Sequence, residues 1–238
     1  MATVVLLRHA RSTANGSGVL AGRTPGVGLD PVGIEQATAL VSRLSGLPLS
    51  AVVSSPLQRC QETLAPLLEQ RGVQAVVEPR LAEVDYGSWT GRELRELVED
   101  PLWRVVQQHP SAAVFPQGEG LAAVQARAVA AVREHDARVA AEHGPDAVWL
   151  ACSHGDVIKA VLADALGLHL DSFQRLVVEP CSISVIRYTE IRPFVLRVND
   201  TGGDLAALLP KPADSAQDQQ GRAAVPTSDA VVGGSTGR

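Results

Sequence analysis

Short apolar runs alternate along the chain with stretches that have helical spacing. The apolar runs, each a candidate buried strand, cover residues 4–7, 49–55, 72–79, 147–153, 182–190 and 194–199. Helices are predicted over 31–46, 56–70 and 156–167, the first beginning with the capping residue Asp30 and then Pro31. Strands and helices that alternate in this way predict an α/β fold with a mainly parallel sheet.

Residues 92–143 are mostly helical in pattern and are interrupted by prolines and by the loop "FPQGEG". The simplest interpretation is a helical insertion over one end of the sheet. We therefore expect a three-layer α/β/α sandwich. The long helix that starts at Leu121 is interpreted as a packing element or a dimer face.

The composition changes near residue 209, where Pro, Ser, Gln, Gly and Asp replace the periodic apolar pattern. This change predicts one domain over residues 1–208 and a disordered tail over 209–238.

Composition and charge exclude several classes of protein. The net charge of −5 provides no basic field for nucleic acid. The three cysteines, Cys60, Cys152 and Cys181, are odd in number and lack CxxC spacing, so we expect reduced thiols rather than disulfides or a zinc site. No run approaches the roughly 20 apolar residues of a membrane helix, and Arg8 interrupts the first run too early for a signal peptide. A cytoplasmic location is the default expectation.

Charged residues gather where the predicted strands end. Arg8 and His9 follow the first strand directly, and His154 follows the strand at 147–153. Arg59 lies one turn into the helix after "VVSSP", and Glu83 lies in the loop after the third strand. The carboxyl ends of parallel strands share one crevice, so we expect these side chains to meet there.

Such a group carries an excess of positive charge that a phosphoryl dianion would neutralise. Arginine binds phosphate oxygens in a bidentate manner, and a neutral histidine nitrogen can act as a nucleophile. Glu83 would protonate the leaving oxygen and then activate water.

Five segments, in order, resemble the motifs of the histidine phosphatase superfamily, the phosphoglycerate-mutase-like proteins. They are "LLRHARSTAN", "SSPLQRCQETL", "LAEVDYGSWTG", "FPQGEG" and "CSHGD". The resemblance covers about residues 3 to 200. It implies that His9 is the nucleophile that becomes phosphohistidine, that Arg8, Arg59 and His154 bind the phosphoryl group, and that Glu83 is the general acid and base.

The resemblance also implies secondary positions at this site. Ser12 and Asn15 match pocket-lining residues, Gly22 matches a residue near the substrate, and the backbone N–H of Gly155 would approach the phosphoryl group. It implies a small phosphorylated substrate, no metal and no other cofactor, and, at the family level, a homodimer.

The chain departs from the family pattern directly after the nucleophile. Ala10 replaces the usual glycine, and Arg11 replaces an acidic or amide residue. Arg11 either adds a cation for a multiply charged substrate or points to solvent.

Two other interpretations fit part of this pattern. A phosphatase is favoured over a phosphomutase with the same residues, because the chain shows no resemblance to the longer insertions and catalytic-site tail of cofactor-dependent phosphoglycerate mutases. A non-catalytic phospho-ligand binding protein would not need both His9 and Glu83.

Four other local features have simpler explanations. Cys181 to Arg187 has the CX5R spacing of cysteine-dependent phosphatases but the composition of a strand, and Cys152 is expected in the core. Glu119 is expected either to cap the helix that follows or to reach the substrate, since the matching loop of the family borders the site, and capping is the favoured interpretation. The remaining histidines, among them His135, are expected on the surface or in loops.

Overall fold

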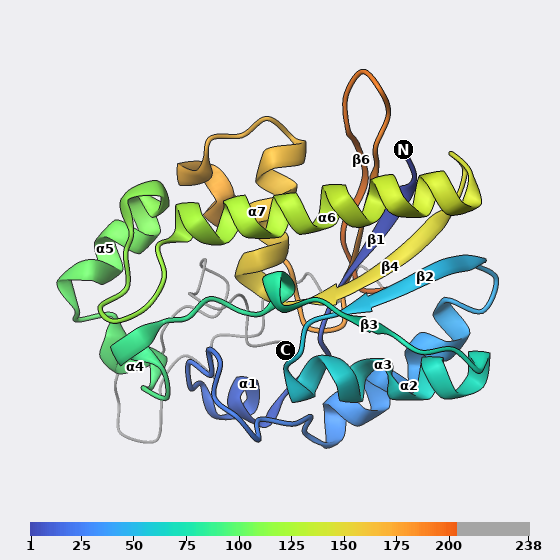
Figure 1. Cartoon of the computed structure of the whole chain (residues 1–238). Coiled ribbons are helices and arrows are strands. Elements are labelled where there is room, and N and C mark those ends of the chain that lie inside the picture. Colours follow the sequence, from blue (N-terminus) through green and yellow to red (C-terminus); the bar gives the residue numbers. More distant parts are fainter. Residues whose placement is uncertain (204–238) are drawn as a thin grey trace.

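A computed structural model describes residues 1–203 of the protein (Figure 1). The tail predicted over residues 209–238 lies outside the described residues. The strands are β1 (Thr3–Arg8), β2 (Leu49–Ser54), β3 (Val76–Val77), β4 (Val148–Ser153), β5 (Ile183–Arg187) and β6 (Phe194–Asp200). The α-helices are α1 (Thr13–Ser17), α2 (Pro31–Arg43), α3 (Gln58–Arg71), α4 (Leu94–Leu97), α5 (Pro101–Gln108), α6 (Leu121–His143) and α7 (Gly155–Ala165). Short 3-10 helices are η1 (Pro79–Leu81), η2 (Gly87–Trp89), η3 (Pro110–Ala112) and η4 (Leu170–Arg175).

The six strands form one sheet in the order β3-β2-β4-β1-β5-β6. The first four strands in this order pair in parallel, whereas β5 and β6 are antiparallel to their neighbours. Arg8 at the end of β1 lies opposite Ser153 at the end of β4, and Ser54 at the end of β2 pairs with Cys152. The prediction of a mainly parallel sheet is confirmed, and three strands end side by side at one edge.

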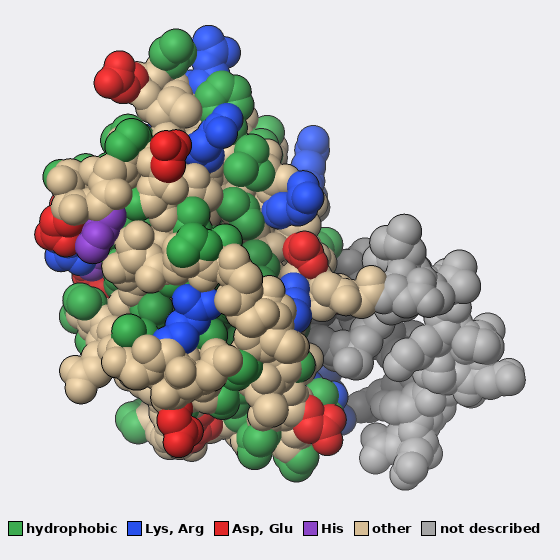
Figure 2. All heavy atoms as spheres, turned by 90° about the vertical axis from the view of Figure 1, so that its right-hand side faces the viewer, with side chains coloured by type: hydrophobic (Ala, Val, Ile, Leu, Met, Phe, Trp, Pro, Cys, Tyr) green, Lys and Arg blue, Asp and Glu red, His purple; other side chains and the backbone are tan. Residues whose placement is uncertain are grey.

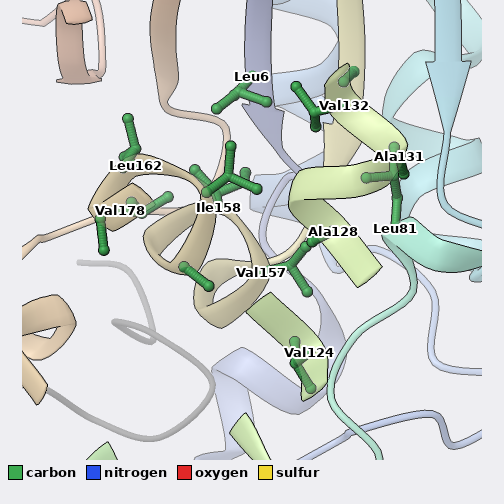
Figure 3. Close-up of a cluster of buried hydrophobic side chains, with 14 of the residues drawn as sticks. Leu6, Leu81, Val124, Ala128, Ala131, Val132, Val157, Ile158, Leu162 and Val178 are labelled. Carbon is green, nitrogen blue, oxygen red and sulfur yellow. The ribbon is translucent and has the colours of Figure 1, made fainter. Parts of the chain in front are cut away.

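Both faces of the sheet are covered, which explains the uninterrupted apolar run of β1. Val4 and Leu6 pack in the core on the side of α6 and α7, whereas Val5 and Leu7 pack on the side of α2 and α3 (Figure 1). A strand buried on two faces has no solvent-facing positions to fill with polar residues. The predicted three-layer arrangement is confirmed. Figure 3 shows part of the core between α6, α7 and β1, with Leu6, Val124, Ala128, Ala131, Val132, Val157, Ile158 and Leu162.

Some predicted elements differ in extent. The strand expected over 72–79 contains only Val76 and Val77, which lie at the sheet edge and are about half exposed. The helical segment 92–143 divides in two: α4 and α5 lie beyond one end of the sheet (Figure 1), whereas α6 contacts β1, β2 and β4 as part of a layer. The expectation that His135 lies on the surface is wrong, because its ring is buried with Nε2 3.0 Å from a Glu78 carboxylate oxygen.

One face of the molecule carries side chains of both charges. On the face shown in Figure 2, acidic and basic side chains are both scattered among apolar ones. Within residues 1–203 no helix combines the length and apolarity that crossing a membrane requires.

Helix α2 packs unusually closely against the segment that follows β1. The contact is made at Gly33, which has no Cβ atom to keep the two backbones apart. A Cβ atom at Gly33 would lie 1.9 Å from the carbonyl oxygen of Arg11. Replacing glycine by alanine inside a helix normally stabilises it by about 0.5–1 kcal/mol. We expect the opposite for Gly33→Ala, a loss of roughly 2 kcal/mol or more in the free energy of unfolding, because the loop must move.

Denaturant unfolding of Gly33→Ala beside Gly46→Ala tests this expectation. Gly46 is the matched control, since a Cβ there meets nothing within 4 Å. Equal stabilities of the two variants would contradict the proposed close packing.

Candidate active site

The expected charged residues come together at the carboxyl ends of the adjacent strands β1, β4 and β2. Arg8 is the last residue of β1 and His9 follows it, while His154 follows β4 and directly precedes α7. Arg59 lies in the first turn of α3, just after β2. Each of these four residues is at least 97% buried. Their proximity follows from strand order, because β4 lies between β1 and β2.

The hydrogen bond of His9 selects its tautomer. His9 Nδ1 lies 2.7 Å from the carbonyl oxygen of Ala10. A carbonyl oxygen only accepts, so Nδ1 carries the proton and Nε2 carries the lone pair. Burial, followed by the positive charges of Arg59 and Arg8, lowers the pKa of His9 well below its usual value. The ring is therefore neutral at physiological pH, with Nε2 as its nucleophilic atom.

His154 is held in the opposite tautomer. Its Nδ1 accepts a hydrogen bond from Arg59 Nη2 at 3.1 Å, and its Nε2 lies 2.7 Å from Ser55 Oγ. A guanidinium only donates, so the ring proton is on Nε2 and is donated to Ser55. Burial and then the charge of Arg59 lower the pKa of His154 well below its usual value. The centroids of the His9 and His154 rings lie 5.2 Å apart, which places the two imidazoles at one site.

Two buried guanidinium groups supply the positive charge of the site. Arg8 Nη1 donates to the carbonyl oxygen of Val178 at 2.7 Å, and Arg59 Nη2 donates to that of Gly22 at 2.9 Å. Arg59 Nη1 is buried and has no hydrogen-bond partner among residues 1–203. Burial lowers the pKa of Arg8 to about 10, so it stays charged near neutral pH. Such groups fit a ligand that brings several anionic oxygens.

Glu83 is a buried carboxylic acid within electrostatic reach of both arginines. One of its oxygens accepts a hydrogen bond from the N–H of Val84 at 2.9 Å. Burial, and next the charge of Asp156, raise the pKa of Glu83 to about 7. Asp156 itself is buried and accepts hydrogen bonds from Tyr86 Oη at 2.8 Å and Lys159 Nζ at 3.1 Å. A carboxyl group that holds its proton up to about pH 7 can act as a general acid.

The raised pKa of Glu83 predicts a pH-dependent cost in stability. The unfolded chain releases this proton near the ordinary value of 4.5, whereas the folded protein keeps it up to about pH 7. Stability therefore falls as pH rises between these values, by about 1.4 kcal/mol per unit at most. Glu83→Gln removes the cost, so we expect the variant to gain about 2–3 kcal/mol on the wild type between pH 5 and pH 8.

Guanidinium chloride unfolding of both proteins at several pH values measures this difference. A constant difference from pH 5 to pH 8 would show that Glu83 titrates normally.

The secondary positions have mainly local contacts. Ser12 and Asn15 form a capping box at the start of α1, with Ser12 Oγ accepting from Asn15 N at 3.2 Å and the Asn15 side chain accepting from Ser12 N at 3.0 Å. Gly155 is buried as the first residue of α7. The Arg11 side chain is partly exposed, and its Nε is ion-paired with Asp30 at 2.8 Å. This ion pair links the loop after β1 to the start of α2.

The cysteine-based interpretations do not fit the structure. Cys181 lies before β5 and the exposed Arg187 ends it, so the CX5R segment does not curl into a loop. Cys152 lies in the core with a pKa raised well above its usual value by burial. The sulfur nearest the site belongs to Cys60, whose Sγ is 3.5 Å from His154 Nε2. Within residues 1–203 no group of three or more His, Cys, Asp or Glu side chains is placed to hold a metal ion.

Sequence reasoning missed several residues around the site. Ser55 and Asp156 lie inside the quoted motifs, so their positions beside the strand ends were an available signal. Arg23 and Arg127 lie outside the motifs that carried the chemistry and have no comparable signal. The expectation that Glu119 caps α6 is wrong. Its carboxylate instead accepts hydrogen bonds from both of these arginines.

Comparison with known proteins places this geometry in context. The chain is 32% identical over 208 residues to "Phosphoserine phosphatase 1" of Hydrogenobacter thermophilus, covering 84% of this chain and 93% of that one. It is 29% identical over 212 residues to "Probable phosphoglycerate mutase GpmB" of Yersinia pestis, covering 87% and 95%.

Solved structures agree with this relationship. A mycobacterial glucosyl-3-phosphoglycerate phosphatase in complex with VO3 superimposes with a TM-score of 0.75 at 27% identity, covering 83% of this chain and 98% of that one. The alpha-ribazole phosphatase of Shigella flexneri superimposes with a TM-score of 0.71 at 26% identity, covering 84% and 96%. A family model described as "Histidine phosphatase superfamily (branch 1)" matches residues 4–201. The chain therefore belongs to the histidine phosphatase superfamily and is an enzyme of that family.

Proposed function

We propose that the protein is a phosphomonoester hydrolase that works through a phosphohistidine on His9 and needs no metal. The observation that carries the proposal is the neutral His9 ring, with its lone pair on Nε2, buried within electrostatic reach of the Arg8 and Arg59 guanidinium groups. Such an arrangement favours attack on a phosphorus atom whose oxygens the guanidinium groups neutralise.

The reaction has two steps. In the first, His9 Nε2 attacks phosphorus, the ester P–O bond breaks, and the leaving oxygen takes the proton of Glu83. In the second, the Glu83 carboxylate accepts a proton from water, the water oxygen attacks phosphorus, and the P–N bond breaks to release inorganic phosphate. Arg8, Arg59 and His154 stabilise the transferring group in both steps.

The secondary residues support this site in smaller ways. We infer that Gly22 acts by holding Arg59 through its carbonyl oxygen, and that Gly155 lets backbone approach the phosphoryl group. Ser12 and Asn15 shape the loop after His9 through their capping box.

A phosphomutase with the same residues is the second candidate, favoured by the similarity to GpmB. It would return the phosphoryl group from His9 to another hydroxyl of the substrate instead of to water. A phosphatase ranks first because the more similar curated relative named above is a phosphoserine phosphatase.

We also propose the cellular setting. The substrate is a small phosphorylated molecule. The protein acts in the cytoplasm as a homodimer and binds no nucleic acid. Its single domain ends near residue 208. The family match over residues 4–201 supports that boundary, and three buried free thiols fit a reducing compartment.

The first experiment is turnover of a panel of phosphomonoesters by EDTA-treated protein. Phosphoserine, 3-phosphoglycerate, an alkyl phosphate and p-nitrophenyl phosphate are followed for released phosphate and for isomerised product. Free phosphate supports the phosphatase, and isomerised product without free phosphate supports the mutase. Neither product from any ester would favour a binding protein and would contradict the proposal.

A further inference from the structure

The backbone around Glu83 is held by an arginine from a distant helix. Arg127 of α6 is largely buried, and its Nη1 donates to the carbonyl oxygens of Arg80 and Ala82 at 2.6 and 2.8 Å. Its Nη2 donates to the carbonyl oxygen of Glu83 at 3.2 Å. One guanidinium thus binds three carbonyl groups within four consecutive residues.

These carbonyl groups belong to a segment with little regular structure. Residues 80–83 run from the end of η1 to Glu83, outside any strand or α-helix. Within residues 1–203, the carbonyl oxygens of Arg80, Ala82 and Glu83 accept from guanidinium groups and not from backbone N–H groups. Arg23 Nε shares the Glu83 carbonyl at 2.8 Å, and Ser153 Oγ donates to the carbonyl of Leu81 between them. Among the described residues, Arg127 alone binds the carbonyls of Arg80 and Ala82, so it makes a large part of the polar contacts that hold this segment.

Glu119 fixes the other side of the Arg127 guanidinium. Its carboxylate accepts from Arg127 Nε at 3.0 Å and from Nη2 at 2.9 Å, and also from Arg23 Nη2 and the N–H of Asp85. Burial acts to raise the pKa of Glu119, but the hydrogen bonds from Arg127 and Asp85 outweigh it and lower that pKa. The carboxylate stays ionised and restricts the guanidinium to one orientation.

We propose that Arg127 is a positioning residue for proton transfer by Glu83, resting on the function proposed above. Within residues 1–203, the hydrogen bonds of Arg127 reach Glu119 and the three carbonyl groups, and none reaches His9 or the residues that bind the phosphoryl group. It sets the backbone from which the Glu83 carboxyl reaches the leaving oxygen. A misplacement of about 1 Å in a reacting group can cost about 10²-fold in rate.

The test compares two esters that differ in their need for an acid. An alkyl phosphate releases a basic alkoxide that must be protonated, whereas p-nitrophenyl phosphate releases a phenolate that leaves readily without a proton. For Arg127→Met we expect kcat/KM to fall about 30- to 100-fold with the alkyl ester. With p-nitrophenyl phosphate we expect a fall of less than about threefold, because little acid catalysis is needed. kcat/KM reports the steps up to transfer to His9, so slow hydrolysis of phosphohistidine does not mask the effect.

Two further variants make the comparison specific. Arg127→Lys keeps the positive charge but loses the planar guanidinium that binds several acceptors at once. We therefore expect its kcat/KM for the alkyl ester to lie between those of Arg127→Met and the wild type, with little change for p-nitrophenyl phosphate. Arg133→Met is the matched control on the same helix, since Arg133 is half exposed and pairs with Asp164 at 2.8 Å, and we expect wild-type kinetics.

The outcomes separate this inference from the proposed function. The positioning role would be overturned if kcat/KM in Arg127→Met fell equally for both esters. If the methionine variant does not fold, the same criterion applies to Arg127→Lys. Glu83→Gln must itself show the selective loss with the alkyl ester. If it does and Arg127→Met does not, only the positioning role fails. If Glu83→Gln slows both esters equally, the acid role of Glu83 fails and the positioning role with it.

Discussion

Replacing His9 by alanine is expected to reduce turnover of every phosphomonoester by at least about 10³-fold. The expectation follows from the neutral ring: Nε2 is the atom that carries a lone pair, and alanine leaves no group to form the covalent intermediate. Because Arg8 and Arg59 remain, the variant should still bind inorganic phosphate or vanadate.

Three measurements check this result: steady-state turnover, ligand binding, and acid-labile phosphoryl label on the quenched protein. His143→Ala serves as the control, because His143 is exposed at the last turn of α6. We expect it to keep full activity and to form the labelled intermediate. Wild-type turnover in His9→Ala would rule out a phosphohistidine on this residue.

Replacing Glu83 by glutamine is expected to slow turnover by about 10²- to 10³-fold while ligand binding changes little. Glutamine has nearly the same shape but cannot give a proton to the leaving oxygen or take one from water. In the wild type, kcat/KM should fall above pH 7 as Glu83 loses its proton, since its pKa is raised to about 7 by burial and by Asp156.

The pH profile of the variant distinguishes this titration from that of the substrate. A phosphate ester loses its own second proton near pH 6, and this titration occurs with both proteins. We expect the decline above pH 7 to disappear in Glu83→Gln. Glu142→Gln is the exposed control and should keep the wild-type profile. A decline of the same size in Glu83→Gln would assign the titration to another group.

Local patterns are sufficient to predict the centre of the site. The residues of β1 before Arg8 are apolar because the strand is buried on both faces of the sheet. Arg8 is the last residue of this strand, and His9 lies beyond it, outside the sheet. The same pattern recurs before His154. Two buried strands that both end in cationic or imidazole groups restrict where those groups can meet, provided the strands are parallel neighbours.

The supporting residues could not be predicted in this way, because their partners lie far away in the sequence. Arg127 contacts carbonyl groups more than forty residues earlier, and His135 pairs with Glu78 across 57 positions. Backbone carbonyl groups carry no side-chain signal, so no pattern marks them as partners of an arginine. Helical periodicity placed His135 on a helix but could not reveal that a carboxylate from another element faces it.

The place of β1 in the sheet also affects how the protein can fold. Thr3 in the first strand pairs with Val148 on one side and with Arg187 on the other. During synthesis β1 therefore leaves the ribosome before the other five strands. It can take its place in the sheet only after β4 and β5, its two neighbours, have been synthesised. Contacts this distant require closure of very long loops and slow the search for the native state. His9 meets His154 only at that late stage, so recovery of activity during refolding should coincide with completion of the whole sheet.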